Sequence, residues 1–177
     1  MLSSKAKYAV RAVAFLAERG RPDGWVQMAE IAEHERIPPK FLEAILVELR
    51  GRGIIESRRG AQGGHRLFRS PAEISVADLI RIVDGPLALT PCASRTQFHP
   101  CSDCVDIARC RLQSLMREAR DAVAGVLEKC SVAELIARPG REALDRPQGG
   151  RPPGGRPRGR KASVATGRRV LAAAKEG

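Results

Sequence analysis

Four cysteines lie close together in the middle of the chain. Cys92, Cys101, Cys104 and Cys110 fall between positions 92 and 110, with the spacing C-x8-C-x2-C-x5-C. The segment around them has little apolar character, so its backbone is free to wrap a metal. Thiolates suit soft or borderline centres, either zinc or an iron–sulfur cluster. A structural zinc site usually has two separated short-spaced cysteine pairs. Only Cys101 and Cys104 form such a pair, so the spacing favours a cluster and leaves zinc as the second choice.

The fifth cysteine and the start of the chain indicate which cysteines can act together and in which redox environment. Cys130 lies apart, near a predicted helix end, and we expect it to be a small buried residue. The first residues, MLSSKAKYAV, lack the apolar stretch of a signal peptide. No apolar run approaches the roughly 18 residues that span a membrane. We therefore expect a cytoplasmic protein without a membrane partner, in which thiols stay reduced.

Charge is spread unevenly along the chain, whose net charge is +11. Residues 1–70 carry a net +5, residues 71–137 a net −2 and residues 138–177 a net +8. A basic N-terminal part and a basic tail both suit a polyanion, and nucleic acid is the first candidate. An anionic membrane would require an amphipathic helix with an apolar face, which the tail lacks. Aromatics make up only 3%, which argues against a base-stacking surface for single strands.

The periodicity of the first 70 residues predicts three helices followed by a hairpin. The expected elements are a helix capped by Ser3 or Ser4 and ended by Gly20, a turn at 21–24, a short helix at 28–34, a helix at 39–52, and strands at 54–59 and 65–69 around a glycine-rich turn. This order predicts a mainly α fold: a winged helix-turn-helix of three helices plus a β-hairpin wing, followed by a long C-terminal dimerisation helix.

The second helix of the helix-turn-helix, residues 39–52, is of the kind that fits the major groove of double-stranded DNA, with its N-terminal turns facing the bases. We therefore expect the following residues to contact DNA: Ser3, Lys5, Pro39, Lys40, Phe41, Glu43, Arg58, Arg59 and His65. Glu43 either accepts a hydrogen bond from a cytosine amino group or is an ordinary solvated residue. Arg58 and Arg59 either enter a narrow groove or mark a charged edge strand.

Three helices are predicted beyond the hairpin. Ser75 and Asp78 have the spacing of a capping box for a helix that stops at Asp84. Apolar residues then trace a stripe along a helix of about 18 residues ending near Leu127. Pairing with a second copy would cover this stripe, and packing on the N-terminal domain is the alternative. We expect a homodimer. Ser131 and Glu134 resemble a capping box for a last short helix.

The tail, residues 138–177, is rich in Gly, Pro and Arg and is expected to be disordered. Its segment Gly155–Arg160 resembles an AT-hook, which lies in A·T-rich minor grooves; the alternative is a solubilising tail.

Residues 1–137 resemble the IscR/NsrR-type (Rrf-two) family of bacterial winged helix-turn-helix regulators. The matching stretches are SSKAKYAVRAVAFLAE, PPKFLEAILVELRGRGIIESRRGAQGGHRL, SPAEISVADLIRIVDGPLAL, the cysteine loop and LMREARDAVAGVLEKCSVAELI. The resemblance implies a dimeric repressor or dual regulator that binds promoter DNA. It also implies that an iron–sulfur cluster sets DNA affinity in response to redox state, nitric oxide or iron.

The resemblance also assigns cluster ligands. Cys92, Cys104 and Cys110 take the places of the family's three cysteines, Gln113 stands where IscR has a histidine ligand, and Cys101 is an extra thiol that could supply the fourth ligand. We expect a 2Fe–2S cluster rather than 4Fe–4S. The expected domains are 1–85 for DNA binding, 86–110 for the cluster, 111–137 for the dimerisation helix and a short packing helix, and 138–177 for the tail.

Two other functions compete with cluster sensing. In one, the protein binds DNA but its cysteines form a thiol or zinc switch without a cluster. In the other, the protein is an enzyme or electron carrier. The sequence has no glycine-rich nucleotide loop and no His, Asp or Ser constellation that would support catalysis. We therefore expect a regulator and not an enzyme.

Overall fold

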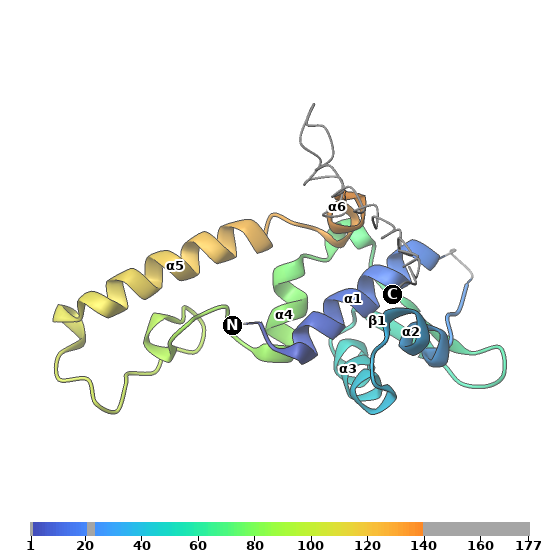
Figure 1. Cartoon of the computed structure of the whole chain (residues 1–177), viewed down its shortest axis with the longest axis horizontal. Coiled ribbons are helices and arrows are strands. Elements are labelled where there is room, and N and C mark those ends of the chain that lie inside the picture. The colour runs from blue at the N-terminus through green and yellow to red at the C-terminus, as the bar shows by residue number, and fades with distance from the viewer. Residues whose placement is uncertain (1, 21–23, 140–177) are drawn as a thin grey trace, which may run out of the picture. The chain divides into compact units, whose positions relative to one another are not determined.

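The structure is a computed structural model that describes residues 2–20 and 24–139. Its main elements are α1 (Ser4–Arg19), α2 (Met28–Glu35), α3 (Pro39–Gly51), β1 (Ile55–Arg58), β2 (Gly64–Leu67), α4 (Val76–Asp84), α5 (Arg111–Leu127) and α6 (Val132–Ala137). Figure 1 shows α1 to α4 and the hairpin gathered on one side. We call this part, together with α6, the head. Helix α5 extends away from it, beside the segment 87–110.

Helix α1 is the centre of the head. Its buried residues are Ala6, Ala9, Ala12, Val13, Phe15 and Leu16. Helices α2, α3, α4 and α6 all pack against it, because the small alanine side chains let neighbouring helices approach closely. The helix begins at Ser3, whose Oγ accepts a hydrogen bond from the Ala6 N–H at 3.0 Å.

A tight turn joins α2 to α3. Arg36 adopts a left-handed conformation with φ of 50°, and its N–H donates to the Glu33 carbonyl at 3.2 Å. The next residue, Ile37, is buried and donates its N–H to the Ala32 carbonyl at 2.9 Å. Pro39 occupies the first turn of α3, where a missing N–H costs no helical hydrogen bond. These residues form the helix-turn-helix.

A backbone bridge joins the hairpin of β1 and β2 to the segment just before α2. The strands pair antiparallel, and Val26 exchanges two backbone hydrogen bonds with His65, at 3.0 and 2.8 Å. Gly64 makes this approach possible. Its φ is +151°, and a Cβ built at this position would lie 2.4 Å from the Val26 carbonyl oxygen. The wing therefore depends on a glycine at position 64.

The last helix, α6, returns the chain to the head after α5. The Val76 N–H donates to the Cys130 carbonyl at 2.9 Å, and the Val132 N–H donates to the Ile74 carbonyl at 2.8 Å. Ser131 and Glu134 form both halves of a capping box. Because these bonds join the residues after α5 to those around α4, the C-terminal end of α5 is attached to the head.

The predicted fold class is confirmed: the structure is a mainly helical winged helix-turn-helix with a two-stranded wing. Both strands are shorter than expected: Ile54 and Arg59 lie outside β1, and Phe68 and Arg69 lie outside β2, which begins one residue earlier, at Gly64. Residues 21–23 of the predicted turn and residues 140–177 of the tail lie outside the described residues. Among the helices described, none is both long enough and apolar enough to cross a membrane.

We predict that Gly64→Ala lowers the free energy of unfolding by about 2 kcal/mol or more, because the new methyl group would meet the Val26 backbone. Urea unfolding of the purified protein measures this effect. Gly51→Ala is the matched control, because Gly51 ends α3 in open space; it should be neutral or stabilise by up to about 1 kcal/mol. Equal unfolding midpoints for native protein and Gly64→Ala would contradict the prediction.

Candidate nucleic-acid interface and cysteine site

Helix α3 presents one buried and one exposed face. Leu42, Ile45, Leu46 and Leu49 are buried in the head. The opposite face carries the predicted DNA contacts Pro39, Lys40, Phe41 and Glu43, which are all exposed. Phe41 is half exposed, at 53%, and its ring meets Tyr8 edge-on with centroids 6.5 Å apart. The structure thus brings these four residues together on the outer side of the N-terminal part of α3.

Two other predicted contacts, Ser3 and Lys5, have partners within the head. The Ser3 hydroxyl caps α1, and its backbone N–H donates to Asp84 at 2.9 Å. The Lys5 ammonium pairs with Glu48 of α3 at 2.6 Å. Both residues therefore hold α1 against its neighbours, and their contact with DNA stays a prediction.

The wing and α3 together border a groove of about 310 Å³. Its lining includes Glu43, Val47, Arg50, Arg58, Arg59 and His65. Arg58 and Arg59 are exposed at the end of β1, so two guanidinium groups face solvent beside α3. Arginine is the residue best suited to phosphates and narrow grooves, so this rim is suited to a nucleic-acid backbone.

His65 has a different environment from the wing arginines. Its Nδ1 lies 2.9 Å from the Ser57 hydroxyl on the opposite strand. Burial, and after it the positive charge of Arg50, lower the pKa of the His65 imidazole below its ordinary value. The ring is therefore neutral at pH 7 and braces the hairpin.

The sequence did not indicate what supports the tip of the wing. Gln27, just before α2, donates from Nε2 to the Ala61 carbonyl at 3.1 Å and to the Gly63 carbonyl at 2.8 Å. This glutamine therefore connects the start of the helix-turn-helix with the turn of the hairpin. Its side chain shows no sequence signal of this role, because the partners are backbone atoms more than thirty residues away.

The cysteine loop, residues 87–110, contains two short 3₁₀ turns, Pro91–Ala93 and Ile107–Arg109. Cys92 is buried in the first turn, Cys104 and Cys110 are half-buried, and Cys101 is exposed. Cys110 is the N-cap of α5, where its Sγ accepts the Gln113 N–H at 3.4 Å. The Gln113 side chain also donates to the Cys92 carbonyl at 3.0 Å. Gln113 thus connects the two ends of the cysteine cluster.

The sulfur atoms of the loop influence one another. The Sγ atoms of Cys92 and Cys101 lie 3.7 Å apart. Cys101 donates a hydrogen bond to Cys92 across this distance. This hydrogen bond is the main cause that raises the pKa of Cys101, and desolvation is the next. Desolvation, followed by the charges of Cys110 and Cys92, raises the pKa of Cys104. In residues 2–20 and 24–139, however, no group of three or more Cys, His, Asp or Glu side chains is arranged to hold a metal ion.

The remaining cysteine and the loop histidine stand apart from this cluster. Cys130 is buried between α4 and α6, as predicted, in an apolar group with Ala6, Val76 and Ile80. His99 is exposed, and its ring contacts the Pro100 carbonyl at 2.8 Å.

Residues 2–138 match the family model of Rrf2, described as an iron-dependent transcriptional regulator. The chain belongs to the Rrf2 family. This confirms the resemblance found in the sequence. The family consists of DNA-binding regulators of transcription, which supports DNA as a partner of this chain. Contact of α3 and the wing with DNA stays a prediction.

Curated Rrf2 relatives align over most of their own lengths. An rrf2-like HTH-type transcriptional regulator of Rhodobacter capsulatus is 36% identical over 139 residues, which is 77% of this chain and 93% of the relative. The HTH-type transcriptional regulator IscR of Photorhabdus laumondii is 34% identical over 144 residues, covering 81% of this chain and 82% of the relative.

Solved structures of Rrf2 regulators share the fold. CymR (YrzC), the global cysteine regulator of B. subtilis, superposes with a TM-score of 0.63 at 27% identity, covering 77% of this chain and 96% of that chain. T. potens IscR superposes with a TM-score of 0.61 at 28% identity, covering 84% of this chain and 93% of that chain. The chain is therefore similar in structure both to CymR, a global cysteine regulator, and to an IscR protein.

We predict that Arg59→Gln lowers affinity for double-stranded DNA and reduces the slope of log affinity against log salt by about one, because one phosphate contact is lost. Fluorescence anisotropy with a labelled duplex at several salt concentrations measures both quantities. Arg117→Gln, an exposed change on α5, is the control and should leave both unchanged. An unaltered slope in Arg59→Gln would place Arg59 outside the interface.

Proposed function

We propose that this Rrf2 protein is a repressor whose affinity for a promoter operator is controlled by an iron–sulfur cluster. In this proposal residues 1–85 bind DNA, 86–110 hold the cluster, and 111–137 form a dimer. The carrying observation is the loop of four thiols whose two ends, Cys92 and Cys110, are both bonded to the first turn of α5 through Gln113.

The donor chemistry fits such a group. Cysteine thiolates are the protein ligands that hold iron–sulfur clusters. The Sγ atoms of Cys92 and Cys101 lie 3.7 Å apart. Cys92, Cys104 and Cys110 would hold the cluster, with Cys101 as the fourth ligand. A bound 2Fe–2S cluster would supply a centre that oxidants, nitric oxide or iron loss can alter.

Contacts within the chain offer a route from the loop to the reading helix. Arg81 of α4 pairs with Glu128 just after α5. About one turn further along α4, Asp84 accepts the Ser3 N–H at the start of α1. Lys5 of α1 in turn pairs with Glu48 of α3, as described above. A loop that is ordered in one state and loose in the other can therefore bias α3 through α5, α4 and α1. Such a population shift needs only about 2–5 kcal/mol.

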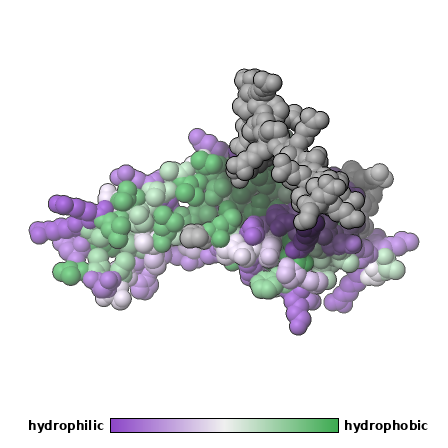
Figure 2. Space-filling model, viewed as in Figure 1, coloured by the Kyte–Doolittle hydropathy of each residue, from purple (hydrophilic) through white to green (hydrophobic). Residues whose placement is uncertain are grey.

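Helix α5 carries an apolar stripe that is exposed in the single chain. Leu112, Leu115 and Val126 are 59%, 56% and 60% exposed, and they recur on one side of the helix. Figure 2 shows hydrophobic residues gathered over this part of the molecule. The stripe borders a groove of about 530 Å³ between α5, α4 and the segment 86–89, lined mainly by apolar side chains. A second copy of α5 would cover both, which supports a homodimer.

We predict that Leu115→Glu converts a dimer into a monomer, because a carboxylate cannot be buried without a partner. Analytical ultracentrifugation measures the mass. Ser114→Glu adds the same charge to the neighbouring exposed position and should leave the dimer intact. A dimeric Leu115→Glu protein would remove α5 from the interface.

We predict that anaerobically purified protein is coloured and contains iron and sulfide, and that Cys92→Ala, Cys104→Ala and Cys110→Ala each abolish the visible absorbance. Cys130→Ala should keep it, because Cys130 lies in the apolar contact between α4 and α6. Absorbance spectra and iron and sulfide analysis give the answer. A coloured Cys104→Ala protein would transfer the ligand role to Cys101, and colourless native protein would reject the cluster.

A thiol or zinc switch is the second candidate, favoured by the same 3.7 Å separation of Cys92 and Cys101. In a thiol switch, the two thiols give two protons and two electrons to an oxidant such as hydrogen peroxide. The oxidant is reduced to water, and an S–S bond of about 2.05 Å forms. Colourless protein with one zinc per chain, or a Cys92–Cys101 disulfide after peroxide treatment, would favour this candidate over a cluster.

A further inference from the structure

A buried arginine holds the Cys92 end of the loop against α5. Of the seventeen residues of α5, all within the described part of the chain, Arg120 is the buried one, at 6% exposure. Its Nη1 donates a hydrogen bond to the Ala93 carbonyl, next to Cys92 in sequence. A buried guanidinium is costly unless its donors and its charge find partners, so this placement requires compensation from nearby groups.

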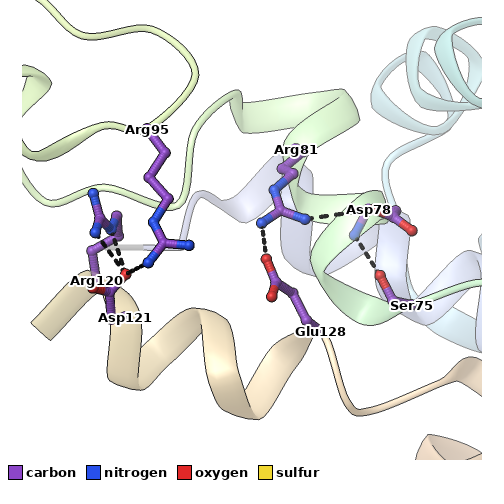
Figure 3. Close-up of polar contacts among 7 residues, drawn as sticks. All are labelled: Ser75, Asp78, Arg81, Arg95, Arg120, Asp121 and Glu128. Carbon is purple, nitrogen blue, oxygen red and sulfur yellow. Dashed lines mark hydrogen bonds and ion pairs between the residues drawn. The ribbon is translucent and has the colours of Figure 1, made fainter. Parts of the chain in front are cut away.

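Asp121 and Arg95 provide that compensation. Asp121 Oδ1 accepts from Arg120 Nε at 2.9 Å and from Nη2 at 2.6 Å. The same oxygen lies 3.0 Å from Nη2 of Arg95, which follows Cys92 by three residues. The hydrogen bond from Arg120 is the main cause that lowers the pKa of Asp121, so the carboxylate is ionised at neutral pH. Figure 3 shows Arg120 and Arg95 converging on Asp121 from the helix and from the loop.

The arrangement needs an arginine at position 120. One guanidinium bonds a loop carbonyl and a helix carboxylate at once, through nitrogens fixed in a planar fork. A lysine has a single nitrogen and could not bridge both partners with the same geometry. A leucine or valine would fill the space without bonding the Ala93 carbonyl.

We propose that Arg120, Asp121 and Arg95, which we name the Cys92 clamp, position the Cys92 thiol by fixing residues 92–95 to the middle of α5. The clamp acts together with Gln113, which holds the Cys92 carbonyl from the first turn of the same helix. Cys92 and Cys110 are thereby fixed relative to one helix, while the exposed Cys101 is free to adjust. Under the proposed function, the clamp presets one part of the ligand set and transmits the state of the loop to α5.

The test is the rate at which iodoacetamide alkylates Cys92 in the reduced, metal-free, full-length protein. Trypsin cleavage after Arg81 and Arg95 isolates Cys92 on one peptide, and cleavage after Lys129 and Arg141 isolates Cys130 on another. Mass spectrometry then follows both thiols in one sample. Both are buried, at 7% and 5% exposure, so Cys130 reports any general loss of folding.

We expect iodoacetamide to alkylate Cys92 about tenfold faster in Arg120→Gln than in the native protein, and about threefold faster in Asp121→Asn. The alkylation rate of Cys130 should be unchanged in both variants. Arg120→Lys keeps the charge but not the fork and should give an intermediate rate. The Gln and Asn variants change the local charge in opposite directions. Removing a positive charge disfavours the reactive thiolate, so a rise in both variants reports exposure of Cys92 and not a shifted pKa.

Two control variants test neighbouring positions of the same helical region. Arg117→Gln changes an exposed arginine one turn before the clamp, and Glu128→Gln breaks the ion pair of Figure 3 that joins α4 instead of the loop. In both variants, Cys92 should be alkylated at the native rate. A rate for Arg120→Gln within about twofold of native would overturn the clamp. If Cys130 also reacts faster in Arg120→Gln, the surface change Asp121→Asn decides: a selective rise at Cys92 supports the clamp, and no rise overturns it.

This outcome is separable from that of the proposed function. The alkylation assay uses protein without metal or DNA, so colourless, iron-free native protein would reject the cluster and leave the alkylation result standing. Conversely, native-like Cys92 alkylation in the metal-free Arg120→Gln and Asp121→Asn variants, combined with coloured native protein, would reject only the clamp.

Discussion

Removing the protons from hydrogen-bonded and partly desolvated thiols is costly, and this cost bears on what the cysteine loop can bind. The Sγ atoms of Cys92 and Cys101 are separated by 3.7 Å, and the pKa values of Cys101 and Cys104 are raised. Without a cation, protons therefore stay on these sulfurs. A soft cationic centre displaces the protons and binds the resulting thiolates. Under this account, the same four side chains form a loose protonated loop in one state and a fixed ligand set in the other.

The rest of the structure gives that change a mechanical consequence. The loop is bonded to α5 through Gln113 and Arg120, and α5 is attached to the head at Glu128 and through α6. A loop tied only to solvent could change state without affecting α3. Here the loop connects α4 of the head to α5, so its order bears on both. The exposed apolar stripe of α5 then determines how two heads would be spaced on one duplex.

Much of this architecture follows from local sequence patterns. The caps at Ser75 and Ser131, the proline at the first turn of α3 and the burial of Cys130 are visible in the sequence because each depends on residues a few positions apart. The bridge between Val26 and His65 and the bonds from Gln27 to the wing were not predictable in this way, since their partners are distant backbone atoms. Arg120 also gave no signal, because an arginine on a helix is ordinarily exposed. The contacts of Ser3 with Asp84 and of Lys5 with Glu48 were likewise not predictable, because the partners are distant in sequence.

The central claim is that the state of the cysteines controls the hold on DNA. The most direct measurement compares the affinity of one promoter fragment for anaerobically loaded, full-length protein and for the same preparation after iron is removed by chelation, at fixed salt. The account predicts affinities that differ by about tenfold or more, which is the effect of a coupling free energy of about 1.4 kcal/mol. Equal affinities in the two states, in protein that demonstrably carried a cluster, would contradict it.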